Sequence, residues 1–185
     1  MTNNQMTFVA FTGSLRKGSF NRLLLRAAVD VAPAGMAIDV HAIDEIPLFN
    51  EDIEDPVPAP VARLKDALAA ADGLLLATPE YNAGIPGVTK NVVDWLSRPP
   101  GKSPLKGKPV GLLGASTGVL GTVRAQTHLR AAFAHNGGIV MPTPQVFVGQ
   151  CREKFDAEGN LVDEKTRAFL TKYMQALAEF AARFR

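Results

Sequence analysis

The sequence TFVAFTGSLRKGSFN, residues 7–21, joins a short apolar run to a polar loop and then to an amphipathic segment. Residues 7–12 are almost wholly apolar over the length of a strand, which is typical of a strand buried on both faces of a parallel sheet. Residues 21–31 carry apolar side chains at helical spacing and end before Pro33 and Gly35. This stretch therefore predicts the first strand–helix unit of an α/β fold.

The same alternation continues to the end of the chain. Further apolar runs of strand length occupy residues 36–43, 73–78, 110–115 and 139–148, the last broken by Pro142 and Pro144. Helical spacing recurs over residues 61–71, 88–96, 122–135 and 163–184. Five such units predict a five-stranded parallel sheet with helices on both faces, and they favour the flavodoxin-like strand order 2-1-3-4-5. Because no linker and no internal repeat divides the chain, we expect a single three-layer domain over residues 1–185.

The composition is that of an ordinary globular protein. Apolar residues make up 46% of the 185 residues, charged residues 21%, and the formal net charge is +2. A nearly neutral chain gives no reason to expect a nucleic-acid or membrane partner. The single cysteine, Cys151, excludes an intrachain disulfide, and residues 1–6 lack the basic start and apolar run of a signal peptide. We therefore expect a cytoplasmic protein.

In an open parallel sheet of this order, ligands bind beyond the carboxyl ends of the strands, beside the first strand. The loop there, residues 13–21, offers the hydroxyls of Ser14 and Ser19, the amide of Asn21 and the cation Arg16, and it leads into a helix N-terminus. Such a terminus attracts anions, and an arginine binds phosphate through a two-pronged contact. A simple helix cap explains one of these polar residues but not four, so the loop favours a phosphate site.

Two further loops are expected at the same edge. Residues 79–87, PEYNAGIPG, contain two prolines and two glycines, which shape a tight loop against which a flat aromatic ligand can lie. Tyr81 offers a stacking face. After the fourth strand, residues 116–118 are small or hydroxylic and leave room for a ligand. An ordinary turn or a helix cap explains each loop separately, but their common position favours a ligand site.

Three stretches resemble the NADPH-dependent FMN reductase family, the flavodoxin-like group that includes chromate and quinone reductases. They are GSLRKGSFN (13–21), PEYNAGIPGVTKNVVDWLSRP (79–99) and LKGKPVGLLGASTGVLGTVRAQTHLR (105–130). The resemblance implies that the FMN phosphate is held by Ser14, Arg16, Ser19, Phe20 and Asn21. It implies that the isoalloxazine ring is flanked by Pro79, Glu80, Tyr81 and Asn82. It further implies that the far side of the site is closed by Ser116, Thr117 and Gly118.

The function implied is that of an oxidoreductase with noncovalent FMN, NADPH or NADH as electron donor, and a small acceptor. Quinones are the favoured acceptors, with chromate, azo dyes and free flavin as further candidates. Since the cofactor carries the redox chemistry, we assign no catalytic acid or base and no metal site. Hydride transfer to the flavin and then to the acceptor predicts ping-pong kinetics.

The sequence leaves two alternatives for the function and two for the assembly. An electron carrier with flavodoxin's fold is the alternative function, although such carriers are commonly strongly acidic and this chain is slightly basic. The family also implies a homodimer or homotetramer. Apolar residues in the segment 88–96, among them Val92, Val93, Trp95 and Leu96, exceed what one sheet face requires and are expected to contribute to subunit contacts.

Overall fold

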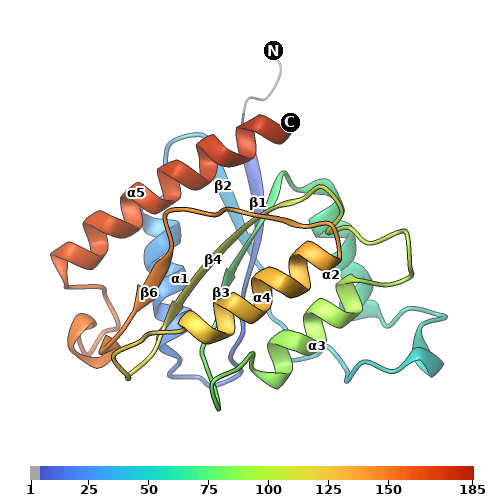
Figure 1. Ribbon diagram of the computed structural model, residues 1–185, viewed down its shortest axis with the longest axis horizontal. Coiled ribbons are helices and arrows are strands. Elements are labelled where there is room, and N and C mark those ends of the chain that lie inside the picture. The colour runs from blue at the N-terminus through green and yellow to red at the C-terminus, as the bar shows by residue number, and fades with distance from the viewer. Residues whose placement is uncertain (1–4) are drawn as a thin grey trace.

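The computed structural model, which describes residues 5–185, is a three-layer α/β sandwich built on a parallel sheet (Figure 1). The strand order is β2-β1-β3-β4-β5, and β6 also pairs with β4. The strands are β1 (Met6–Thr12), β2 (Met36–Val40), β3 (Gly73–Ala77), β4 (Pro109–Ala115), β5 (Ile139–Val140) and β6 (Val146–Val148). The α-helices are α1 (Phe20–Asp30), α2 (Ala59–Ala70), α3 (Gly87–Leu96), α4 (Val123–His135) and α5 (Glu164–Ala181). The predicted fold class and strand order are confirmed.

The predicted fifth strand forms two short segments that continue one another along β4. Ile139 and Val140 of β5 pair with the start of β4, and β6 pairs with its end, beginning with Val146 opposite Leu113. The intervening residues 141–145 contain the two prolines, which have no N–H group to donate to a ladder. The predicted interruption is therefore confirmed, and its cause is the missing backbone donors.

Strand β2 is shorter than the apolar pattern indicated. The ladder ends at Val40 opposite Ala10, and His41 N–H donates the last bond to the Ala10 carbonyl, at 2.8 Å. Ile43 then packs into the core on the opposite face of the sheet from Ala10. The apolar run 36–43 therefore combines a strand with a core residue of the following loop.

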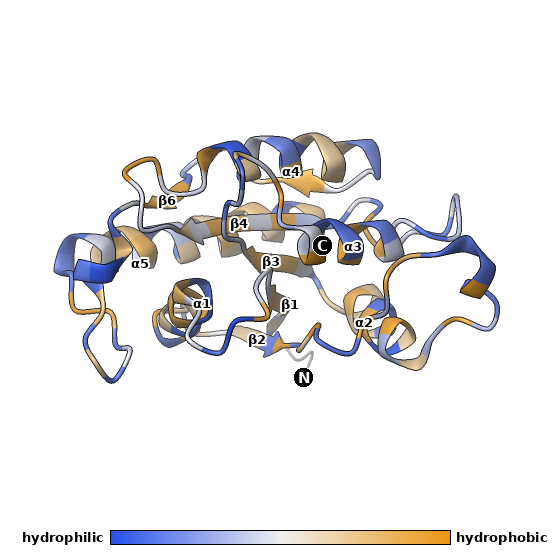
Figure 2. Cartoon of the chain, turned by 90° about the horizontal axis from the view of Figure 1, so that it is seen from below, coloured by the Kyte–Doolittle hydropathy of each residue, from blue (hydrophilic) through white to orange (hydrophobic). Residues whose placement is uncertain are grey.

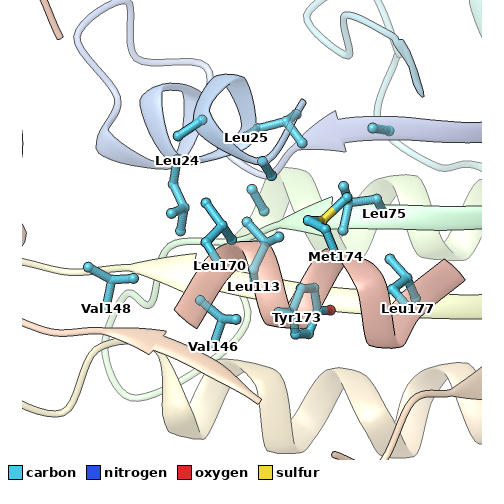
Figure 3. Close-up of a cluster of buried hydrophobic side chains, with 14 of the residues drawn as sticks. Leu24, Leu25, Leu75, Leu113, Val146, Val148, Leu170, Tyr173, Met174 and Leu177 are labelled. Carbon is cyan, nitrogen blue, oxygen red and sulfur yellow. The ribbon is translucent and has the colours of Figure 1, made fainter. Parts of the chain in front are cut away.

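Apolar residues of the strands separate into two cores, one on each face of the sheet. Figure 2 shows the sheet between α1 and α5 on one side and α2 and α3 on the other. Along β1, Phe8 and Ala10 point toward α1 and α5, whereas Val9 and Phe11 point toward α2, α3 and α4. Figure 3 shows the first of these cores, where α5 places Tyr173 among leucines and valines. The buried Tyr173 hydroxyl donates to the Leu112 carbonyl at 2.9 Å, and burial raises the pKa of this phenol, which keeps it neutral. No helix within residues 5–185 is long and apolar enough to cross a membrane.

The apolar residues of α3 are used inside the chain itself. Val92, Val93, Trp95 and Leu96 are each at most 2% exposed. The expectation that they supply surplus surface for subunit contacts is therefore wrong, because α3 packs between the sheet and the segment that follows β2.

Helix α3 holds that segment with two side chains of the family-specific stretch. Asn91 accepts from the backbone N–H of Phe49 at 2.7 Å and donates to the Pro47 carbonyl at 2.8 Å. The indole N–H of Trp95 donates to the same carbonyl at 2.9 Å, and its ring meets that of Phe49 edge to face, with 5.1 Å between centroids. Asn91 and Trp95 therefore have a structural role, because their hydrogen bonds hold the segment that follows β2 against α3.

Candidate functional site

The loops after β1, β3 and β4 converge on one cavity of about 280 Å³ at the carboxyl edge of the sheet. Ten of the twelve residues expected from the sequence line it, namely Ser14, Arg16, Ser19, Phe20, Asn21, Pro79, Glu80, Tyr81, Ser116 and Thr117. Ala115, which the sequence did not single out, completes the lining. Asn82 and Gly118 lie on the same loops but do not line the cavity.

The first loop presents donors toward an anion. Ser14 and Ser19 are buried, at 5% and 2% exposure, and Ser19 caps α1 by accepting from the Asn21 N–H at 3.2 Å. Within residues 5–185, the backbone N–H groups of Lys17, Gly18 and Phe20 have no acceptor. Free N–H groups at a helix N-terminus, together with the helix dipole, form a site for a phosphate-sized anion.

Arg16 adds a full positive charge to this edge of the cavity. Its guanidinium lies 5.8 Å from the centroid of the Phe20 ring and forms no ion pair with any residue from 5 to 185. A neighbouring carboxylate would compete with an anionic ligand for Arg16, and none of the described residues does so. The charge of Arg16 is therefore available to an anion bound at α1.

The backbone at position 13, where this loop begins, lies so close to α3 that only a glycine fits. A Cβ atom on Gly13 would lie 2.1 Å from the Thr89 hydroxyl, which donates to the Gly13 carbonyl at 3.2 Å. Thr89 is fully buried on α3, 76 residues further along the chain. Thr89 thus fixes the loop 13–21 at Gly13, a role that was not predicted from the sequence. The available signal was a threonine among the apolar residues of the segment 88–96.

Asn21 connects the first loop to the third. Its side-chain amide donates to the Ala115 carbonyl at 2.9 Å and accepts from the Ala115 N–H at 2.8 Å. Both groups are buried at the end of β4. Asn21 therefore lines the cavity and also fixes the distance between the start of α1 and the end of β4.

Glu80 connects the second loop to α4. One carboxylate oxygen accepts from the backbone N–H groups of Arg124 and Ala125, at 2.8 and 3.1 Å, and the other is 3.2 Å from the Arg124 guanidinium. Thr122, at the start of α4, provides no side-chain cap of its own. The side chain of Glu80, only 9% exposed, thus acts as the missing cap, with its charge at the positive end of the helix.

Tyr81 stands at the rim of the cavity on a two-residue turn. Tyr81 and Gly84 exchange backbone hydrogen bonds at 3.3 and 3.0 Å, and the intervening Asn82 and Ala83 both have positive φ, at 50° and 60°. Positive φ at both central residues defines the tight turn typical of hairpins. The turn leaves Tyr81 53% exposed, so one aromatic face is open to a ligand or to another chain.

Replacement of Glu80 by Ala should expose the first turn of α4. The Arg124 and Ala125 amides lose their acceptor, a change that typically costs about 1–2 kcal/mol at a helix cap. Hydrogen exchange followed residue by residue should show faster exchange of these two amides, with the Leu129 amide in the middle of α4 unchanged. Equal protection of the first turn in both proteins would show that Glu80 does not cap α4.

Comparison with known proteins agrees with this geometry. The family model for NADPH-dependent FMN reductase matches residues 6–153. An NAD(P)H-dependent FMN reductase of Pseudomonas aeruginosa is 41% identical over 184 residues, which cover 99% of each chain. A quinone reductase of Escherichia coli is 40% identical over 98% of each chain. The flavoenzyme NAD(P)H:(acceptor) oxidoreductase FerB from Paracoccus denitrificans superposes with a TM-score of 0.89 at 35% identity, covering 97% of this chain and 98% of its own.

The resemblance inferred from the three loop sequences is therefore confirmed over nearly the whole chain. The same comparisons support FMN as the cofactor and NAD(P)H as the electron donor. Both the three-layer fold and the sequence identities lead to one conclusion: this chain belongs to the NADPH-dependent FMN reductase family of oxidoreductases.

Proposed function

We propose that this chain holds FMN noncovalently in the cavity between the three loops and uses NADPH or NADH to reduce quinones. The observation that carries the proposal is the anion site at α1, at one end of the cavity, where two buried serines lie with backbone N–H groups and an Arg16 side chain that find no partner among residues 5–185. The other end is bordered by the exposed ring of Tyr81. A phosphate attached to a flat ring system matches this pairing of donors and aromatic surface.

The residues present fit FMN better than a dinucleotide. The loop has one anion site and lacks the Gly-x-Gly-x-x-Gly pattern that would hold a pyrophosphate. Ser14, Arg16 and Ser19 would hold the phosphate, while Pro79, Tyr81 and Thr117 border the space for the ring. FMN, when bound, supplies the hydride chemistry, and the chain supplies binding and orientation.

Two relatives favour a quinone as the acceptor. The 2-hydroxy-1,4-benzoquinone reductase of a Burkholderia species is 41% identical over 166 residues, covering 90% of this chain and 91% of its own, and the Escherichia coli relative is named a quinone reductase. In this chain, residues 116–118 at the cavity are small, and Tyr81 lies at the rim. A rim of this kind admits a flat nicotinamide and then a flat acceptor, one after the other.

We also propose that the chain forms a homodimer or homotetramer in the cytoplasm, with the cavity close to a subunit contact. The apolar residues of α3 are buried inside the chain and give no support for association. Val119 and Leu120, which follow the cavity residues 116 and 117, are 77% and 53% exposed. Exposed large apolar side chains on two of the site loops, Tyr81 on the second and these two on the third, are typical of an interaction surface. Cys151, buried and unpaired, suits a reducing compartment.

Replacement of Arg16 by Ala should weaken FMN binding about tenfold to a hundredfold, because one charge-assisted contact worth about 1.5–3 kcal/mol is lost. A fluorescence titration of the apoprotein with FMN measures the change. Lys172→Ala is the control, since Lys172 is an exposed cation on α5 that does not line the cavity. If Arg16→Ala binds FMN as tightly as the unaltered protein, the phosphate is held elsewhere.

Stopped-flow mixing separates a reductase from an electron carrier. The FMN-loaded protein should lose its flavin absorbance rapidly with NADPH or NADH and regain it when a benzoquinone is added, without a second protein. Steady-state rates should give parallel lines in double-reciprocal plots, as expected for ping-pong exchange. A flavin that neither nucleotide reduces would instead establish the carrier function.

Light scattering at micromolar concentration should give at least twice the chain mass of 19.8 kDa. Leu120→Glu should lower that mass, because it places a charge in the proposed contact. Leu48→Glu, at an 81% exposed position on the segment after β2, should not. A monomer mass for the unaltered protein would contradict the assembly and leave the flavin site as it is.

A further inference from the structure

The loop after β1 separates two cavities. Arg16 lines the proposed flavin cavity, whereas its neighbours Leu15 and Lys17 line a second cavity of about 660 Å³ on the other side of the loop. Ser14 borders both. The second cavity lies between α1 and the segment that follows β2, and the flavin site described above makes no use of it.

The floor of the second cavity is apolar. Leu25 and Val29 of α1 form one wall, and Val40 and Ile43, at and after the end of β2, form the other. Val40 is 52% exposed and Leu15 is 49% exposed, so large apolar side chains remain open to solvent at its mouth. Such a surface favours a ligand with an apolar body.

Positive charges surround the mouth. Lys17 and Arg22 form no ion pair with any residue between 5 and 185. Arg26 is directed instead toward the loop before α5, where it donates to the Glu158 carbonyl at 3.4 Å and to the Asn160 side chain at 3.5 Å. Asp44 is the one carboxylate in the described lining. The charge at this mouth therefore complements an anion.

A buried hydroxyl adds an independent observation. Thr12, at the end of β1, lines the cavity and is only 9% exposed, and its hydroxyl has no hydrogen-bond partner within residues 5–185. Buried hydroxyls are nearly always paired, and an unpaired one needs an explanation. The oxygen itself has almost no accessible surface, so an acceptor atom of a ligand at the end of β1 pairs with it only when the Thr12 side chain turns toward the cavity.

We propose that the second cavity is a binding site for an aromatic carboxylate, separate from the flavin site. The ring system lies on Leu25, Val29 and Val40, and the carboxylate faces Arg22 and Lys17. Because Ser14 and the loop 13–17 form the common wall, the bound carboxylate lies directly behind the proposed phosphate contacts. The site depends on the fold alone and not on the proposed quinone chemistry.

The test is a titration of the FMN-loaded protein with 2-naphthoate, followed by two-dimensional NMR of the backbone amides. Shifts should concentrate at residues 25–29 and 40–44. The neutral analogue 2-naphthamide should bind at least tenfold more weakly, because it lacks the charge that faces the cations. The same titration of the apoprotein should shift the same set of residues even if flavin binding itself proves wrong, so the two proposals fail separately.

Two variants and one control localise the binding. Arg22→Gln should weaken 2-naphthoate binding about tenfold, and Ala42→Trp, which fills the cavity mouth from an exposed position, should abolish it. Lys172→Gln removes an exposed cation on α5 that lines none of these cavities, and it should have no effect.

Three affinity results would overturn the proposal, and so would one result of the NMR titration. The affinity results are equal affinity for the acid and the amide, an affinity that Arg22→Gln leaves unchanged, and displacement of 2-naphthoate from the apoprotein by added FMN. The last result would place the aromatic acid in the flavin cavity. Absence of any shift at residues 25–29 and 40–44 would equally reject the site, whether because a second copy of the chain covers it or because it binds nothing.

Discussion

Side-chain to backbone hydrogen bonds between distant segments hold the three site loops in position. A parallel sheet brings the carboxyl ends of its strands to one edge, but it does not fix the loops that follow them. Thr89 fixes the first loop from α3, Asn21 fixes the start of α1 to the end of β4, and Glu80 fixes the second loop to α4. A site that binds a ligand through backbone N–H groups needs this rigidity, because those groups cannot adjust by rotating a side chain.

The same hydrogen bonds also satisfy backbone N–H and carbonyl groups that are buried. The peptide of Ala115 lies just where β4 ends, so its N–H and carbonyl leave the ladder while still enclosed by protein. An unpaired buried peptide group costs about 1–3 kcal/mol, and the Asn21 amide pairs both ends at once. Glu80 does the same for α4, where Thr122 leaves the first N–H groups uncapped. Structural pairing and site architecture are therefore supplied by the same residues.

These long-range bonds mark the limit of what the sequence could predict. Apolar runs predicted β1, β3 and β4 to within a residue or two. Both faces of a central strand are buried, so its sequence is a continuous apolar run whose ends are easy to recognise. Position at the sheet edge, together with the family resemblance, predicted ten of the residues that line the cavity. Partners 44 to 94 residues apart leave no periodic signal, so the roles of Glu80 and Asn21 became visible only in three dimensions. The same limit explains Trp95, whose apolar ring suggested a subunit contact but is buried against Phe49.

The loop 13–17 illustrates how one short segment can present two different surfaces. Arg16 lines the cavity that holds the buried Ser19, while its neighbours Leu15 and Lys17 line the second cavity. Any ligand that orders this loop from one side must change the free energy of binding on the other side, and the effect is reciprocal. The sign depends on whether the two ligands require the same loop conformation. Thr89 and the Ser19 N–H already hold that loop, at the Gly13 and Arg16 carbonyls, by hydrogen bonds that do not depend on either ligand. Such preorganisation leaves little ordering for a second ligand to contribute, so the coupling between the two cavities should arise mainly from the charges of Arg16, Lys17 and Arg22 rather than from loop closure.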